Sequence, residues 1–207
     1  IQTSGLHGVA LNPSPTQRHP PGLEFHLMER PTVLLVLPGR EPVLILPELE
    51  TEKLKSAPYP IHSITYGDNP ATWQDAFNRA ANFLQLSGKT LGVEPTWLRF
   101  LESQFLQSSA PGVNLASAEA LVASLRMKKD AEEIGCMRKA VQIAQDALRA
   151  TLSAIRPGAT EREIASELTA ALLKAGSDPP MPFSPIVSGG PNSANPHASP
   201  SDRPLQT

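Results

Sequence analysis

The residue best suited to chemistry in this chain is a histidine near its end. His197 closes a segment rich in Gly, Pro and Asn that runs from Pro185 to Ala198. Gly and Pro adopt backbone geometries that other residues resist, so such a loop can aim a side chain into a cleft. A neutral imidazole can donate or accept a proton near pH 7, which suits it to orient a scissile amide or to transfer a proton. A purely structural or exposed histidine is the alternative.

The other ionisable residues show no spacing typical of metal ligands. His26 and Glu29 stand at i and i+3, which could ligate a metal on a helix, but a surface pair is the simpler interpretation. Toward the C-terminus only Asp178, His197 and Asp202 are candidates, and prolines separate them. A two-metal hydrolytic site needs several Asp, Glu and His side chains that converge. We therefore expect no complete metal site in this chain.

Nucleophilic catalysis has no motif to support it. The chain has no Gly-x-Ser-x-Gly sequence, and Ser188-Gly-Gly190 lacks the Lys-Ser/Thr continuation of a phosphate-binding loop. Glu132 and Glu133 fit the solvated start of a helix better than a catalytic pair. Cys136 lies inside the same predicted helix, and we expect it to be a buried, inert thiol.

Composition limits the classes of function. The 207 residues are 40% hydrophobic, enough for one large domain or two modest ones, and the net charge of -2 offers no basic surface for nucleic acid or anionic membrane. A single cysteine rules out an internal disulfide framework and fits a reducing compartment. No apolar run approaches the roughly 18 residues of a membrane span, and no stretch is typical of a signal peptide. We expect a cytoplasmic protein without nucleic-acid or membrane partners.

The first part of the chain alternates strand and helix patterns. Apolar segments bounded by turn residues predict strands over 9–12, 32–37, 42–46, 61–66, 90–93 and 113–116. Apolar residues at helical spacing predict helices over 73–86 and 96–105. The segments 32–37 and 42–46 predict an antiparallel hairpin, and their lack of polar alternation predicts a sheet covered on both faces. Together these elements predict an α/β domain over roughly 1–118.

The second part of the chain is helical. Apolar residues step by three or four along 134–155, which predicts one long helix over 129–155. Thr160-Glu-Arg-Glu163 is a capping box that opens a second helix, and Gly176 follows that helix as a C-cap. Little sequence remains to cover the large apolar face of these helices. The first domain, a partner or further sequence must therefore pack there.

Three stretches of this chain resemble the pita-bread metallopeptidases and their relatives, namely Xaa-Pro aminopeptidases, Xaa-Pro dipeptidases (prolidases) and creatinase. The first includes Ala10–Pro15, Glu29–Leu35 and Pro42–Glu50, which are similar to the N-terminal domain of these enzymes. The second, Leu125–Ile134 with Arg138–Ala140, resembles the linker and the first helix of the pita-bread domain. The third, Ile186–His197, resembles the loop that carries the substrate-binding histidine of the family.

One segment departs from the family pattern. Relatives usually carry a sequence of the form Tyr-Leu-Thr-Gly at the position where this chain has Arg18-His-Pro-Pro-Gly22. The departure gives no support for a contribution of His19 to a site.

The resemblance implies an α/β fold with two parts. A creatinase-type N-terminal domain with a mixed sheet and flanking helices is expected over 1–118, and the linker and first helices of an incomplete α+β pita-bread domain over 119–207. It also implies a dinuclear metallohydrolase that uses Mn, Co or Zn and cleaves the bond between a first residue and a proline at position two. In such enzymes two Asp, one His and two Glu hold the metals, and a metal-bridging hydroxide attacks the carbonyl.

The resemblance assigns His197 to substrate binding near the scissile bond and to assisting proton transfer. Relatives carry their first metal-binding Asp shortly after the segment that matches Asp202–Thr207, so all five ligands fall outside this sequence. We therefore expect the 207-residue chain to hold no metal and to be inactive by itself. The implied partners are a proline-containing peptide substrate and a second copy of the chain in a homodimer.

Two alternatives remain open from the sequence. The chain could be a non-catalytic dimerisation or binding module, since family N-terminal domains often mediate dimerisation. It could also belong to a metal-free amidinohydrolase like creatinase, which uses this histidine as its acid and base. The stretches Pro47–Glu50 and Asn195–His197 are more similar to the peptidases. The choice between aminopeptidase and dipeptidase depends on residues outside this sequence.

Overall fold

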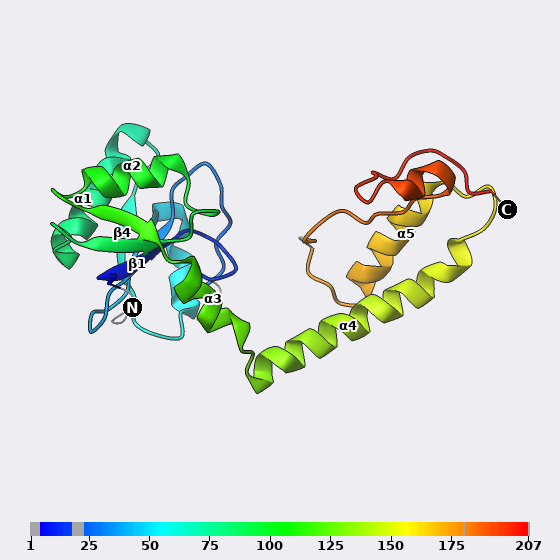
Figure 1. Cartoon of the computed structure of the whole chain (residues 1–207), viewed down its shortest axis with the longest axis horizontal. Helices are drawn as coiled ribbons and strands as arrows, with labels where there is room; N and C mark the ends of the chain where they lie inside the picture. Colours follow the sequence, from blue (N-terminus) through cyan, green and yellow to red (C-terminus); the bar gives the residue numbers. More distant parts are fainter. Residues whose placement is uncertain (1–4, 18–22, 180, 207) are drawn as a thin grey trace. The chain divides into compact units, whose positions relative to one another are not determined.

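The chain folds into two compact units, residues 1–128 and residues 129–207, in the computed structural model (Figure 1). The structure describes residues 5–17, 23–179 and 181–206. Arg18–Gly22, including His19, lies outside the described residues. The first unit extends past the boundary at 118 that the sequence suggested, because a helix over Glu119–Met127 buries Val122 in its core.

Unit 1 is built on a six-stranded mixed sheet with the strand order β4-β3-β2-β1-β5-β6. Its strands are β1 (Gly8–Leu11), β2 (Val33–Val36), β3 (Val43–Pro47), β4 (His62–Tyr66), β5 (Thr90–Val93) and β6 (Asn114–Ser117). The predicted hairpin is confirmed, because β2 pairs antiparallel with β3 in a register that sets Leu34 against Leu44. Strand β1 pairs antiparallel with β2 and parallel with β5, so it joins the two halves of the sheet.

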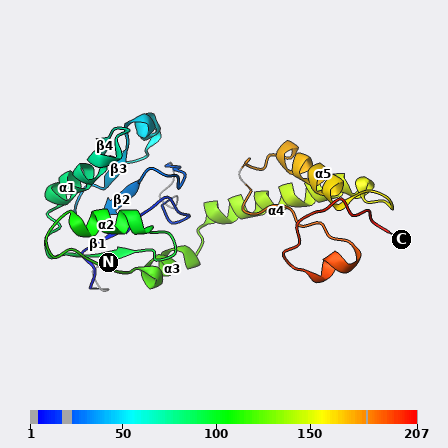
Figure 2. The same ribbon diagram turned by 90° about the horizontal axis from the view of Figure 1, so that it is seen from above.

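Both faces of this sheet are covered, as the unbroken apolar strands predicted. Val33 and Leu35 of β2 pack with Phe77 in one apolar cluster, while Leu34 between them packs with Val122 in another. The first face is covered by helices α1 (Trp73–Leu84) and α2 (Phe100–Ser108), which lie against the strands in Figure 2. The second is covered by helix α3 (Glu119–Met127) and the 3-10 helix η1 (Glu48–Ser56).

Helix α2 begins later than its sequence pattern predicted. The carbonyl of Glu94 accepts hydrogen bonds from the N–H groups of Trp97 and Leu98, which form a turn at the positions where the helix was expected. Arg99 then has an extended backbone, and the helix starts at Phe100. The predicted start at residue 96 was therefore wrong, because local hydrogen bonds to Glu94 compete with the helix.

A buried carboxylate fastens a loop of unit 1 to α2. Glu102 is fully buried, and both of its carboxylate oxygens accept from the guanidinium of Arg99. Arg99 also donates to the carbonyl of Met28, in the segment that leads into β2. A buried charge is tolerated only when it is paired, so this ion pair both satisfies Glu102 and fixes the loop.

Replacing Gln85 by Gly is expected to stabilise unit 1 by about 0.5–1 kcal/mol. Gln85 caps α1 at φ 54 and ψ 58, a left-handed conformation that strains residues with a Cβ. Urea unfolding followed by tryptophan fluorescence measures the change, because both tryptophans lie in unit 1. Gln85→Ala keeps the strain and is the matched control. Equal stability of the Gly and Ala variants would contradict the expectation.

Unit 2 consists of two helices and a long returning segment. Helix α4 (Ala131–Thr151) continues into the 3-10 helix η3 (Leu152–Ala154), and helix α5 (Glu161–Lys174) packs against α4. Capping boxes open both helices, with Asp130 and Glu133 at α4 and with Thr160 and Glu163 at α5, as the sequence predicted for the second helix. Among the described residues no helix is long and apolar enough to cross a bilayer.

Helix α4 has one face against α5 and one exposed apolar face. Ala147 and Thr151 are buried, and they line a groove together with residues of α5. The predicted apolar stripe lies elsewhere on the helix, and its side chains are exposed within this chain: Ile134, Met137, Val141, Leu148, Leu152 and Ile155. Cys136 is exposed too, so the expectation of a buried thiol was wrong. The helix surface around Cys136 has no covering element among the described residues of unit 2.

Candidate functional site

The segment that carries His197 returns along α5 and pairs with its start. Residues 201–205 make backbone hydrogen bonds of 2.8–3.1 Å with residues 158–162, in both directions. The N–H groups of Glu161 and Arg162, the first two of α5, donate to this returning segment. Helix starts leave such donors without a partner in the helix itself, so the returning segment completes the N-terminus of α5. In Figure 1 it is the orange and red part of the chain beside α5.

The side chain of Glu161 lies at the centre of this arrangement and is 0% exposed. Its carboxylate accepts from the Gly189 N–H at 2.7 Å, the Asn192 amide at 3.1 Å, the Ser201 N–H at 3.0 Å and the Ser201 hydroxyl at 2.6 Å. The hydrogen bonds from the Ser201 hydroxyl and the Gly189 N–H lower the pKa of Glu161 to about 2, against the opposing effect of burial. Glu161 is therefore ionised in the folded chain at neutral pH.

The structure explains why both Gly189 and Gly190 are glycines. A Cβ on Gly189 would lie 2.6 Å from the Leu205 side chain, which is closer than real contacts allow. Gly190 has φ +55 and begins the short 3-10 helix η4 (Gly190–Ala194) beside the guanidinium of Arg203. The motif thus forms a tight turn that brings the Gly189 N–H onto Glu161.

His197 is exposed at the end of this loop. Its backbone N–H donates to the side-chain oxygen of Asn195 at 3.0 Å, and the N–H of Ala198 donates to the Asn195 carbonyl at 3.2 Å. Asn195 therefore orders the backbone around His197. The Asn192 amide donates to Glu161.

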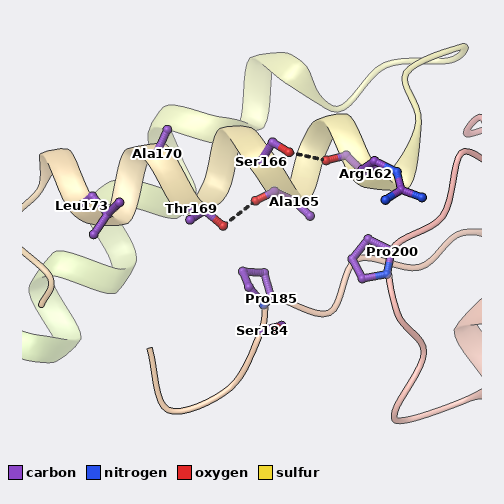
Figure 3. A pocket seen from close by; sticks show the side chains of 9 residues that line it. All are labelled: Arg162, Ala165, Ser166, Thr169, Ala170, Leu173, Ser184, Pro185 and Pro200. Carbon is purple, nitrogen blue, oxygen red and sulfur yellow. Dashed lines mark hydrogen bonds between the residues drawn. The ribbon is translucent and has the colours of Figure 1, made fainter. Parts of the chain in front are cut away.

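Unit 2 also has a groove of about 470 Å³ along α5. It lies between α5 and Ser184, Pro185 and Pro200 (Figure 3). The hydroxyls of Ser166 and Thr169 donate to carbonyls of α5 at 2.9 and 2.8 Å, so the groove presents mainly apolar atoms. Arg162 at its end is held by Asp202 at 2.7 Å. No His, Cys, Asp or Glu is among the described residues that line the groove, so its lining residues supply no general base.

The residues considered for metal binding do not converge. His26 and Glu29 are exposed in an irregular segment of unit 1, as expected for a surface pair. Asp202 pairs with Arg162 rather than with His197. Across residues 5–17, 23–179 and 181–206, no group of three or more His, Cys, Asp and Glu side chains could hold a metal ion. The described residues therefore do not fit a dinuclear metal centre.

Sequence reasoning missed Glu161 as part of this arrangement. The residue stands inside the Thr160–Glu163 capping box, where an acidic residue is ordinary. Its partners Gly189 and Ser201 are 28 and 40 residues away, so no local pattern points to them. A cluster of Gly, Asn and Ser downstream of a helix start is the only signal that was present.

Comparison with known proteins identifies both units. The family model of the creatinase/prolidase N-terminal domain matches residues 22–128, and that of metallopeptidase family M24 matches residues 135–207. A putative dipeptidase of Bacillus subtilis (strain 168), YkvY, is 27% identical over 172 residues, which are 83% of this chain and 47% of that protein. The chain spans about half the length of the curated relatives it matches.

Solved structures agree on the fold. A prolidase from Thermococcus sibiricus superposes with a TM-score of 0.85 at 23% identity, over 99% of this chain and 55% of that one. An Xaa-Pro dipeptidase from Bacillus anthracis superposes with a TM-score of 0.80 at 25% identity, over 100% and 55% of the two chains. The chain thus belongs to the family of the creatinase/prolidase N-terminal domain, and its second unit matches the metallopeptidases of family M24.

Proposed function

We propose that this chain forms the N-terminal half of a metallopeptidase that cleaves Xaa-Pro bonds in dipeptides or at the N-terminus of peptides. The observation that supports it most is the ordered loop Gly189–Ala198, which presents an exposed His197 at the end of an M24-like unit. The relatives' printed names, dipeptidase, prolidase and Xaa-Pro dipeptidase, agree with this substrate class.

In this proposal His197 binds the substrate beside the scissile bond. An exposed imidazole can donate a hydrogen bond from its ring N–H to a substrate carbonyl, and in its protonated form it can donate a proton to the leaving amine. The Asn195 turn orders the backbone on either side of it. Two divalent metal ions, Mn, Co or Zn, would be held by residues outside this chain, and the complete enzyme would act in the cytoplasm as a homodimer.

Turnover assays on Xaa-Pro dipeptides test the proposal. We expect the 207-residue chain, supplied with Mn²⁺, Co²⁺ or Zn²⁺, to give no turnover above the blank, because its described residues gather no metal ligands. A chain extended through the downstream reading frame to the length of its relatives is expected to turn over. There, His197→Ala should lower kcat/KM by about 10²–10⁴-fold with the metal content unchanged.

Each alternative has its own result in the same assays. Turnover by the 207-residue chain alone would contradict the proposal that the metal ligands lie outside these residues. Hydrolysis of creatine without metal by the extended chain would favour the amidinohydrolase. A reading frame that stops after Thr207 would favour the non-catalytic module.

A further inference from the structure

The loop that carries His197 has few backbone links to the rest of unit 2. Within residues 188–198 the described backbone hydrogen bonds are local: Asn192 donates to Gly189, Asn195 to Asn192 and Ala198 to Asn195. The following segment 201–205 differs, because it pairs through its backbone with residues 158–162. The loop must therefore be fastened to α5 by side chains.

Glu161 supplies that fastening. One of its carboxylate oxygens accepts from the Gly189 N–H, the amide of Asn192 donates to both oxygens at 3.1 Å, and the other oxygen accepts from Ser201. The carboxylate thus joins the beginning of the loop at Gly189, its 3-10 turn at Asn192, and the following segment at Ser201. In the described residues no other side chain of α5 contacts the segment 188–198 through a hydrogen bond.

Every group that points at Glu161 is a donor. Backbone N–H, hydroxyl and carboxamide N–H groups can all be satisfied by an ionised carboxylate, which only accepts and has about four acceptor positions. A glutamine of the same shape would place an NH₂ group against these donors and leave some of them buried without a partner. The hydrogen bonds of this arrangement are therefore satisfied best by a carboxylate at position 161, and by its ionised form.

We propose that Glu161 is the positioning residue for His197, acting through Gly189, Asn192 and Ser201. Its role in presenting His197 to a substrate rests on the proposed function, whereas its role in ordering the loop stands on the hydrogen bonds alone. Glu163, two residues along the same helix, closes the capping box of α5 and makes no hydrogen bond to the loop in the described residues. Loop order and helix order can therefore be separated by substitution.

Hydrogen exchange of the 207-residue chain, resolved by NMR, tests the proposal. In Glu161→Gln the amides of Gly189 and Ser201 are expected to exchange roughly 10–100-fold faster, since their hydrogen bonds to a charged group are lost. The amide of His197, which donates to Asn195, should exchange faster as well because the loop that carries it loses its attachment to α5. The interior amides of α5 should keep their protection. The matched control Glu163→Gln removes a charge from the same helical turn and is expected to leave the loop amides unchanged.

Two outcomes would overturn the proposal. Unchanged exchange of the loop amides in Glu161→Gln would show that other contacts hold the loop. A parallel loss of protection in α5 would show that Glu161 serves the fold of unit 2 in general. Ser201→Ala is the milder variant if Glu161→Gln fails to fold, because Glu161 keeps its bonds from Gly189, Asn192 and the Ser201 N–H. It removes the 2.6 Å hydroxyl bond to Glu161 and the acceptor of the Arg203 N–H at 3.2 Å, and it should accelerate the same amides by a smaller factor. Both outcomes are read from hydrogen exchange alone, so they are independent of whether the extended chain has peptidase activity.

The pH dependence gives a second test. The pKa of Glu161 falls from 4.5 to about 2 on folding, so the ionised form stabilises the loop. This stabilisation is fully present above pH 4.5 and is lost as the pH falls through about 2. The Gly189 and Ser201 amide shifts of the folded chain should therefore stay constant down to about pH 3 and then change, and Glu161→Gln should lack this transition. A midpoint above 4.5 would contradict the proposal.

Discussion

Replacing Arg99 by Met should lower the free energy of unfolding of unit 1 by about 3–5 kcal/mol, because it leaves the buried carboxylate of Glu102 without its partner. The Glu102 side chain is 0% exposed, and both of its oxygens accept from Arg99. The same substitution releases the Met28 carbonyl and with it the segment before β2. Urea unfolding of the 207-residue chain, followed by tryptophan fluorescence, measures the loss.

An exposed ion pair of the same unit provides the control. Lys55 and Glu52 pair at 2.6 Å with both side chains more than three-quarters exposed. Exposed pairs contribute between zero and about 1 kcal/mol, so Lys55→Met should change stability by less than that. Similar losses in Lys55→Met and Arg99→Met would refute the buried position of the Glu102 pair.

The exposed apolar face of α4 should bind the hydrophobic dye ANS in the isolated chain. Met137, Val141, Leu148 and Leu152 are each more than half exposed and stand on this face. Contiguous apolar surface of this kind is rare on isolated soluble chains and is a site of association. The combined variant Met137→Glu, Val141→Lys, Leu148→Glu and Leu152→Lys should reduce the ANS fluorescence by at least about half.

The same variant should keep its helices. It places Glu before Lys at i and i+4 twice, an arrangement that stabilises exposed helices by about 0.2–0.5 kcal/mol per pair. Circular dichroism at the helix band checks this. The control Ala147→Leu changes the buried side of α4, and overpacking there should destabilise by about 1–3 kcal/mol without lowering ANS binding. Undiminished dye binding in the combined variant would locate the exposed apolar surface elsewhere.

Local sequence signals predicted most of the fold. Unbroken apolar segments marked the strands, apolar periodicity marked α4, and a capping box marked the start of α5. Elements decided by distant contacts were not predicted. Helix α3 was assigned to the linker, although Val122 packs in a cluster with β1, β2 and β3. The polar segment after β1 gave no signal that Ser14 and Thr16 would bury their hydroxyls on Glu94 at 2.7 and 2.6 Å.

In the candidate site, too, local sequence signals were informative and contacts between distant residues were not predicted. The sequence indicated His197 as a candidate because its loop is rich in Gly, Pro and Asn, and the bond from its N–H to Asn195 joins residues only two apart. Glu161 could not, since its role depends on partners that only the folded chain brings together. Cys136 was predicted wrongly, because a helical position says nothing about which face finds a covering element.

The pairing of residues 158–162 with residues 201–205 bears on how unit 2 is assembled during synthesis. Helices α4 and α5 are neighbours in the chain, so their packing needs the closure of only a short connection. The bonds from Glu161 to Ser201 span 40 residues, and contacts of such separation are slower to form. The segment that carries His197 is therefore expected to pair with α5 only after α4 and α5 have packed, once the chain through Leu205 has emerged from the ribosome.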